Sequence, residues 1–292
     1  MSLKKKIKSI IAVISPELLT KIIYRLNFKE KMNLKNPQNI CEKNQWLKFN
    51  TYRNNSLVTL CADKYRVREY IKEKNCSEIL NELLYVWDNS NQIHWEELPQ
   101  KFVIKCNHGC GYNIICDDKE KLDFSVVKDT IDKWMREDYW KLFGEINYKY
   151  IPKKIICEKY LNDGYGSSLR DYKFFCIHGK VEVLEVCMNR REHGGHPEEY
   201  YFDSDWNYLP PIKGNSGLKM VMDKLPEKPE CFEEMLKYAE ILSEDFPFVR
   251  VDFYEINNKV IFSELTFTSA GGFDTTLMDV QPNIGDKLKL DI

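Results

Sequence analysis

Residues 246–268, FPFVRVDFYEINNKVIFSELTFT, carry two acidic side chains inside apolar runs that otherwise have the composition of buried strands. The pair Asn257–Asn258 separates the two runs, and a two-residue connection of this kind predicts an antiparallel β-hairpin. Asp252 lies on the first predicted strand and Glu264 on the second. An unpaired charge is costly in an apolar strand. The fold must therefore place a cation or a metal ion next to each of these two acids.

The pairing of these two strands decides how close the acids come. Counting residues outward from the turn brings Asp252 close to Ile261, and Glu264 opposite Val249 or Arg250. The two acids are therefore expected to be diagonal neighbours at best. With Arg250 they could form a charge ladder on the surface of the sheet. Alternatively, a hard divalent cation such as Mg²⁺, shared with bound phosphates, would offset the cost of burying them.

A second motif is the glycine-rich stretch KFVIKCNHGCGYNII, residues 101–115, which begins as an apolar strand with a single internal lysine. Gly109 and Gly111 would let backbone N–H groups approach an anion, and Lys105 would supply a compact positive charge for phosphate oxygens. The GxxxxGK[ST] pattern of a P-loop is absent. This stretch alone is compatible with a phosphate cradle and with a plain glycine hairpin.

Two further segments carry charges in patterns that point to a site. In DYKFFCIHGKV, Asp171 and Lys173 alternate onto one face of a predicted strand. The segment 188–202, MNRREHGGHPEEYYF, surrounds a double glycine with the basic residues Arg190, Arg191, His193 and His196. Such a basic loop suits an anionic substrate, although a solvated turn has the same composition.

The hydrophobic pattern changes near residue 101. The N-terminal third shows apolar positions every three or four residues, most clearly over 61–88, and predicts helices. From residue 101 onward, short β-rich runs alternate with two helical stretches, 123–140 and 229–245, and IHGKV gives a further hairpin signal. This order predicts an α+β domain built on antiparallel sheets, preceded by a mostly helical region.

The ten cysteines raise the question of disulfides and of zinc. No C-x-x-C pair occurs, several cysteines lie inside apolar runs, and Cys106, His108 and Cys110 have no second pair of ligands nearby. The N-terminal run lacks a signal-peptide cleavage pattern, so we expect a cytoplasmic protein with buried free thiols. A formal net charge of -2 gives no basis for binding nucleic acid.

The N-terminal segment MSLKKKIKSIIAVISPELLTKIIYRL is basic at its start and apolar further on. Ser15 and Pro16 interrupt the apolar run, predict the start of a second helix, and leave the run far short of the ~20 residues that span a bilayer. Two interpretations stay open. The helices pack on the body of the protein, or residues 3–26 make weak contact with the inner face of an anionic membrane.

The order of the motifs (lysine and glycine loop, IICEKYL, DYKFF…GKV, RVDFY…FSELTFT) resembles the TupA-like ATP-grasp family over roughly residues 50–285. The family belongs to polysaccharide biosynthesis clusters. The resemblance implies an ATP-grasp fold, in which two α+β subdomains grip ATP between antiparallel sheets. It also implies a division of the chain into N-terminal helices 1–40, a helical pre-grasp segment 41–100 and an ATP-grasp domain 101–292, made of a nucleotide-gripping part 101–163 and a catalytic and metal-binding part 164–292.

The resemblance further implies residue roles. Lys173 would face the γ-phosphate and Arg250 would steady the reacting phosphoryl group, while Asp252 and Glu264 would hold Mg²⁺. The family usually has Asn two residues after that glutamate, where this chain has the weaker ligand Thr266. The motif EKYL, made of Glu158, Lys159, Tyr160 and Leu161, matches the hinge of the family, which contacts adenine largely through backbone groups. The other implied nucleotide contacts are Lys64, Lys105, Asn107, His108, Gly109, Gly111, Asn113 and Asp171.

The activity that the resemblance implies is an ATP- and Mg²⁺-dependent, ADP-forming carboxylate–amine ligase. ATP would convert a carboxylate into an acylphosphate, and an amine would displace phosphate to give an amide. The carboxylate would be a hexuronic acid or an amino acid, bound at the basic loop 188–202, and the product would enter a capsular or cell-surface polysaccharide. The alternatives are a kinase of the same fold, a glycosyltransferase and a non-catalytic nucleotide-binding scaffold.

Overall fold

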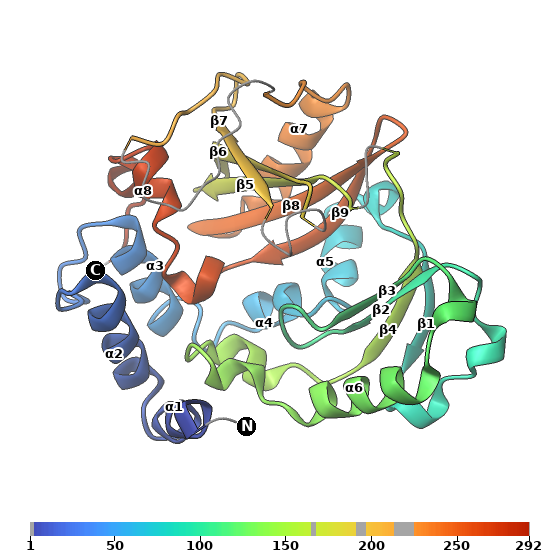
Figure 1. Cartoon of the computed structure of the whole chain (residues 1–292). Helices are drawn as coiled ribbons and strands as arrows, with labels where there is room; N and C mark the ends of the chain where they lie inside the picture. The colour runs from blue at the N-terminus through green and yellow to red at the C-terminus, as the bar shows by residue number, and fades with distance from the viewer. Residues whose placement is uncertain (1–2, 165–167, 191–196, 213–224, 292) are drawn as a thin grey trace.

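A computed structural model of the chain describes residues 3–164, 168–190, 197–212 and 225–291, and shows two separate antiparallel sheets (Figure 1). The first sheet has the strand order β1 (Leu83–Trp87), β4 (Ile155–Lys159), β2 (Phe102–Cys106), β3 (Asn113–Cys116). The second has the order β7 (Glu198–Phe202), β6 (Lys180–Met188), β5 (Asp171–Ile177), β8 (Phe248–Ile256), β9 (Lys259–Thr266). This architecture confirms the predicted α+β class.

Among the described residues, five α-helices precede the first strand, one lies within the sequence of each sheet, and two follow the last strand. The α-helices are α1 (Leu3–Ile14), α2 (Pro16–Phe28), α3 (Ile40–Phe49), α4 (Ser56–Ala62), α5 (Val67–Glu73), α6 (Phe124–Arg136), α7 (Phe232–Ser243), α8 (Thr276–Val280) and α9 (Ile284–Lys287). No helix in the described part of the chain is both long and apolar enough to cross a membrane. The mostly helical N-terminal region is as predicted.

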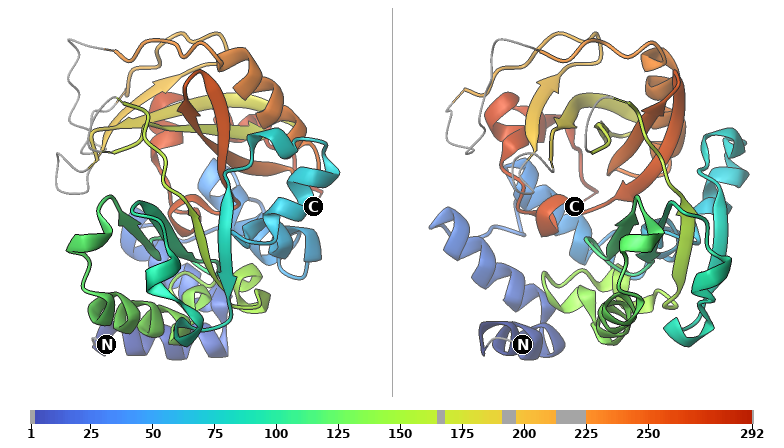
Figure 2. Two further views of the ribbon diagram at one scale, coloured as in Figure 1. Left: turned by 90° about the vertical axis from the view of Figure 1, so that its right-hand side faces the viewer. Right: turned by 45° about the vertical axis from the view of Figure 1, so that its right-hand side comes forward.

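Each sheet carries a helix on one face. Helix α7 packs against β5, β6 and β8, where Phe174 and Phe253 meet edge to face and Phe232 of the helix packs over Phe174. Helix α6 packs against β2. Two further views show the second sheet with α7 in the upper part of the molecule and the first sheet with α6 in the lower part (Figure 2). One face of the second sheet is therefore apolar and covered, which leaves its other face for polar groups.

One predicted helix is wrong in its second half. The sequence pattern predicts a helix over 61–88, but α5 ends at Glu73 and residues Leu83–Trp87 form the edge strand β1. All five residues of β1 are half-buried, so the strand shows no alternation of apolar and polar positions. Pairing with β4, which depends on residues far along the chain, decides the conformation of this segment.

Both predicted hairpins are present. His178–Gly179 joins β5 to β6, Asn257–Asn258 joins β8 to β9, and all four residues have positive φ, as tight two-residue turns require. The expected register of the second hairpin is wrong, however. Ile261 pairs with Tyr254, not Asp252, and a β-bulge next to Asp252 shifts the register by one further residue, so Asp252 pairs directly with Glu264.

The ten cysteines are all free thiols, and nine of them are buried. Cys110, in the glycine loop, is exposed and so departs from the expectation that every thiol is buried. In apolar surroundings the pKa of a thiol rises, as at Cys106, where burial raises the pKa to about 12. These thiols therefore act as small apolar side chains of the core.

Candidate active site

The second sheet carries a row of charged residues across its uncovered face. Glu185 on β6 pairs with Lys173 on β5, Lys173 pairs with Asp252 on β8, and Asp252 pairs with Glu264 on β9. Directly paired residues point to the same face of a sheet, so all four side chains share the face opposite α7. Acid, base, acid and acid follow one another over four adjacent strands.

Arg250 lies on the same face, two residues before Asp252, and binds it with two hydrogen bonds. Its Nε and Nη2 donate to the Asp252 carboxylate at 2.7 and 2.6 Å, and its Nη1 donates to Ser269 Oγ at 2.7 Å. Asp252 is only 3% exposed, and burial raises its pKa to about 6 although Arg250 opposes the rise. The arginine thus neutralises a carboxylate that the fold has withdrawn from water.

Glu264 is neutralised by a different cation. Lys64, in the loop between α4 and α5, forms an ion pair with it, and Arg250 Nη2 lies 3.5 Å from its other oxygen. Burial opposes ionisation, but Lys64 and Arg250 together lower the pKa of Glu264 to about 2. Glu264 is therefore ionised at neutral pH, and the structure brings Lys64, Arg250, Asp252 and Glu264 into one cluster, while their roles toward metal and nucleotide stay predictions.

The residue before Lys64 ties this cluster to the glycine loop. Asn107 Nδ2 donates to Asp63 Oδ1 at 2.8 Å, and the Lys64 N–H donates to the Asn107 carbonyl at 3.2 Å. Asn107 Nδ2 also reaches the Pro152 carbonyl, and its Oδ1 accepts from the Lys154 N–H. The Asn107 side chain therefore anchors the loop inside the protein, and the nucleotide contact expected of Asn107 stays a prediction.

Gly109 and Gly111 are favoured over other residues for two different structural reasons. A Cβ on Gly109 would lie 2.8 Å from Tyr112 Cε2 and 2.9 Å from the Tyr139 ring, so only glycine fits there. Gly111 has a φ of +75° with open space around it, so its backbone conformation, not crowding, favours glycine. The next strand, β3, begins at Asn113, an exposed residue paired with Lys105.

The side chain of His108 connects the glycine loop to helix α6. Its ring is buried beside Tyr112, and Nε2 lies 3.1 Å from the carbonyl oxygen of Trp134 near the end of α6. Burial lowers the pKa of His108, so the neutral ring is favoured. The predicted nucleotide contact of His108 can thus come from its backbone, while its side chain secures the loop to α6.

Lys105 points to a carboxylate on the neighbouring strand. Its Nζ lies 2.7 Å from Glu158 Oε2, and Arg68 lies 3.8 Å from the other oxygen of that carboxylate. Glu158 is buried on β4. Its side chain therefore fixes Lys105 in the sheet, a contact that the hinge pattern EKYL did not predict.

The hinge itself borders a pocket of about 450 Å³ between the end of β4 and the tip of the β8–β9 hairpin. Its lining residues are Leu80, Asn81, Glu82, Lys159, Tyr160, Leu161, Asn162, Ile256, Asn257, Lys259 and Ile261. The backbone of Lys159 is already bonded, because its N–H donates to the Glu82 carbonyl and its carbonyl accepts from Asn81.

Lys173 is the cation of the row and is held by two neighbouring side chains of β6. Its Nζ lies 2.8 Å from Glu185 Oε1 and 2.7 Å from Cys187 Sγ. Although burial favours the neutral amine, the charge of Glu185 raises the pKa of Lys173 above its ordinary value. Glu185, Cys187 and Glu199 have ligand atoms within 4.8 Å of one another, and the ammonium group of Lys173 already contacts two of them.

Of the predicted substrate residues, the structure describes Arg190. Arg190 donates to Asp171 at 3.0 Å, so the two form an ion pair at the end of the sheet next to the row. Arg191, His193 and His196 lie outside the described residues. Asp171 is therefore joined to an arginine, and its expected contact with nucleotide stays a prediction.

A tight turn after β9 supports Arg250 from the other side. Residues Ser269–Gly272 form a 3-10 turn in which Ala270, Gly271 and Gly272 all have positive φ. Helix α3 braces it, because Gln45 Nε2 donates to the Gly271 carbonyl at 3.0 Å and Lys48 Nζ lies 3.4 Å from the same oxygen. The turn in this way fixes Ser269 against Arg250.

A family model described as TupA-like ATPgrasp matches residues 42–289, which include every element of both sheets. The chain belongs to this TupA-like ATP-grasp family. The match confirms the predicted family and the predicted ATP-grasp fold. No curated protein matches the chain.

Several solved structures resemble this TupA-like chain. D-alanine–D-alanine ligase from Bacillus anthracis, complexed with ATP, is 12% identical with a TM-score of 0.45, and the match covers 78% of this chain and 60% of that one. L-amino acid ligase from Bacillus licheniformis is 12% identical with a TM-score of 0.44, covering 89% and 57%. D-alanine–D-alanine ligase from Helicobacter pylori is 15% identical with a TM-score of 0.42, covering 86% and 69%. The chain spans less than two thirds of the length of the two Bacillus ligases.

The TupA-like chain departs from the usual ATP-grasp pattern at Thr266. Its hydroxyl lies 3.3 Å from Glu264 Oε1 and accepts from Arg250 Nη2 at 3.2 Å. The threonine therefore lies within the charged cluster, although a hydroxyl is a weaker metal ligand than the amide oxygen of asparagine.

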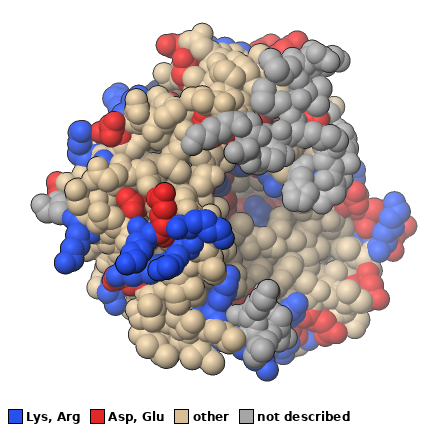
Figure 3. Space-filling view, turned by 60° about the vertical axis from the view of Figure 1, so that its left-hand side comes forward, with Lys and Arg blue, Asp and Glu red and all other residues tan. Residues whose placement is uncertain are grey.

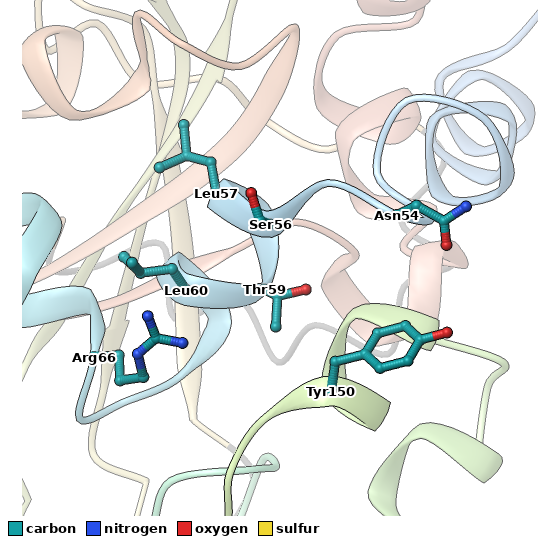
Figure 4. Close-up of a pocket in the computed structure, with 7 residues that line it drawn as sticks. All are labelled: Asn54, Ser56, Leu57, Thr59, Leu60, Arg66 and Tyr150. Atoms are coloured by element: carbon teal, nitrogen blue, oxygen red, sulfur yellow. The ribbon is translucent and has the colours of Figure 1, made fainter.

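Another pocket lies away from the charged row. It has a volume of about 550 Å³ and is lined by Asn54, Ser56, Leu57, Thr59, Leu60, Arg66 and Tyr150. Figure 4 shows these side chains on α4, on the loops around it and on the short helix that ends at Tyr150. None of the sequence-predicted site residues lines this pocket.

Sequence reasoning missed the residues that hold the predicted ones in place. These are Asp63, Arg68, Glu185, Cys187, Ser269 and the bracing pair Gln45 and Lys48. A signal existed for Glu185, because it is an acid within the apolar run of β6. For the others, the contact depends on segments brought together by folding.

Proposed function

We propose that this protein is an ATP- and Mg²⁺-dependent ligase that joins a carboxylate to an amine. The observation that carries the proposal is the direct pairing of Asp252 and Glu264 beside Arg250 and Lys173 on one face of the sheet. Family membership supports it, since the match covers both sheets.

The donor chemistry of the site fits Mg²⁺. Asp252 and Glu264 are carboxylates on adjacent strands, and hard cations prefer oxygen ligands. Arg250 and Lys64 neutralise Asp252 and Glu264 respectively. A divalent ion bound to the two carboxylates would take over part of this neutralisation. Thr266 is the third candidate ligand. A bound Mg²⁺ would supply charge neutralisation for the phosphate oxygens.

The nucleotide would lie between the two sheets. Lys105 and the backbone N–H groups of the loop 107–113 would bind phosphate oxygens, because glycines there permit close approach. The pocket beside the hinge would take the adenine. Since the backbone of Lys159 is already bonded to residues 81 and 82, we assign the adenine contacts to the backbone of Tyr160 and Leu161.

The chain's own residues would act mainly by charge and position. Lys173, kept protonated by Glu185, would bind the transferring phosphoryl group, and Arg250, fixed by Asp252 and Ser269, would stabilise the charge that develops on it. ATP supplies the phosphoryl group that converts the carboxylate into an acylphosphate. Attack by the amine then forms the amide and releases phosphate.

The substrate class follows from the same family. We propose a hexuronic acid or amino acid as the carboxylate, an amine partner and a product used in cytoplasmic steps of capsular or cell-surface polysaccharide assembly. Arg190 and the predicted residues Arg191, His193 and His196 would form the carboxylate-binding loop. A kinase of the same fold would stop at a stable phosphorylated product.

The test mixes the purified chain with ATP, Mg²⁺, a nucleotide-uronate and a panel of amines. We expect release of ADP and phosphate, with an amide product found by mass spectrometry. Glu264→Gln and Lys105→Ala should abolish turnover. Glu182→Gln is the control, because Glu182 lies on the same sheet but pairs with Lys287 outside the site. This variant should keep wild-type turnover.

Two results would contradict the proposal. Failure of the chain to bind nucleotide in the presence of Mg²⁺ excludes an ATP-dependent enzyme. A phosphorylated substrate that accumulates when no amine is present, and stays unchanged when amine is added, identifies a kinase instead.

A further inference from the structure

Helices α1 and α2 expose an unusual amount of apolar surface. They lie at the lower edge of the molecule (Figure 1) and precede residues 42–289, which match the family. The large apolar side chains exposed in this segment are Ile7, Ile10, Val13, Ile14, Leu18, Ile22 and Leu26. The rest of the described chain exposes only five such side chains, so this concentration is a local property of the two helices.

The apolar stripe of α1 faces away from the protein. Ile7, Ile10 and Ile14 recur at helical spacing and are all exposed, with Ile10 at 60%. Ala12, on the other side of the helix, is fully buried against the body. A surface helix of a globular protein normally turns its apolar stripe inward, so the packing of the core does not account for the stripe of α1.

Helix α2 has two adjacent apolar stripes, one buried and one exposed. Leu19 and Ile23 are buried in the core. Leu18, Ile22 and Leu26 follow one another at intervals of four residues and are exposed. The exposed stripe of α2 begins four residues after the last residue of α1, Ile14, and α1 contacts α2.

The same segment is strongly basic, although the whole chain has a formal net charge of -2. Residues 3–29 contain one acid, Glu17, and the cations Lys4, Lys5, Lys6, Lys8, Lys21, Arg25 and Lys29. Glu17 pairs with Lys21, one helical turn away. Figure 3 shows an uncharged area at the bottom of the molecule, where Figure 1 has α1, with basic side chains along its border.

We propose that this α1–α2 surface, residues 3–29, docks on an anionic lipid bilayer. The exposed apolar side chains would enter the headgroup region, and Lys6, Lys21, Arg25 and Lys29 would bind lipid phosphates. Charge decides between possible occupants. A second copy of the chain would bring the same excess of cations to the interface, and like charges would oppose that association. The inference does not depend on the substrate of the enzyme.

The experiment is flotation of the full chain with vesicles of two compositions. We expect the protein to float with vesicles containing phosphatidylglycerol and to stay behind with pure phosphatidylcholine. Added salt should weaken binding, because part of the attraction is electrostatic. Ile10→Glu should lower the bound fraction about tenfold, since it inserts an acid into the apolar stripe.

A matched control is Val126→Glu on α6, where the valine is exposed to the same extent, 60%. It should leave flotation unchanged. Unaltered thermal unfolding of both variants shows that neither has disrupted the fold. The proposal is overturned if the wild-type chain ignores anionic vesicles at low salt, or if Ile10→Glu binds them as well as wild type. A wild-type dimer that Ile10→Glu converts to a monomer also overturns it, in favour of a second copy.

Discussion

At the scale of single residues, the site depends on acids that keep cations charged in a buried setting. Burial alone would lower the pKa of a lysine, yet Glu185 opposite Lys173 raises it. The same logic holds at Arg250 and Asp252. Removing one partner of such a buried pair costs about 3–5 kcal/mol, because the other charge is left without compensation. The pairs therefore serve position as well as charge.

The first prediction concerns Glu185 as a positioning residue for Lys173. Glu185→Gln should lower kcat about tenfold or more with little change in the KM for ATP, since Lys173 loses its fixed orientation. Without the negative charge, the pKa of Lys173 falls, so activity should decline at a lower pH on the alkaline side than in wild type. Steady-state rates across pH measure both effects. Glu185→Asp should restore part of kcat, and an unchanged alkaline limb in Glu185→Gln would refute the role.

A second residue-scale prediction follows from His108. Burial lowers its pKa below the ordinary 6.5, so below that pH the unfolded chain takes up a proton that the folded chain resists. This contribution to stability is present above pH 6.5 and is lost as the pH falls through the folded pKa. Urea midpoints should drop more for wild type than for His108→Gln between about pH 7.5 and about pH 5.5. Equal drops would show that His108 does not titrate on unfolding.

At the scale of elements, the turn after β9 shows how backbone conformation and space act separately. Ala270 adopts φ 49°, ψ 35° without a steric reason to be small, whereas a Cβ on Gly271 would lie 2.5 Å from Phe143 Cγ. Both residues have positive φ. Substitutions at the two positions should therefore have opposite effects.

We expect Ala270→Gly to stabilise the fold by up to about 1 kcal/mol, because the left-handed conformation is strained for alanine. Gly271→Ala should destabilise it by more than about 2 kcal/mol, since it adds both backbone strain and a clash with Phe143. Denaturant unfolding of the two variants gives both values. Equal and opposite small changes would mean that the turn adjusts freely and does not brace Ser269.

At the scale of the whole molecule, the sequence predicts what local pattern determines. The two hairpins follow from turn residues with positive φ, and the two acids follow from charge in apolar strands. The strand β1 was missed because its residues are all half-buried and show no period. The pairing of Asp252 with Glu264 was missed for two reasons. The two-residue turn by itself brings Asp252 opposite Ser263, two residues beyond the expected Ile261, and the bulge, which has no clear signal in the sequence, shifts the register by one more.

The contacts between distant segments could not be predicted from the sequence either, because they also depend on how the strands pair. The sequence predicts that Asn107 belongs to a glycine loop, yet its side chain forms hydrogen bonds with Asp63, Pro152 and Lys154, which come from other segments. The sequence predicts a hinge residue at Glu158, yet its side chain neutralises Lys105 on the adjacent strand. Spacing along the chain contains no information on such partners, since they meet only when the sheet forms.

The short stretch Asp63–Lys64 contacts both the glycine loop, through Asn107, and the carboxylate Glu264. A metal ion at Glu264 would release the ammonium group of Lys64, which the phosphates could then attract. A polyphosphate that drew Lys64 away would, in turn, leave Glu264 open to the ion. By thermodynamic reciprocity, each ligand must strengthen the other by the same factor. One lysine would thus make metal and nucleotide cooperative, without any need for the two to arrive as a preformed complex.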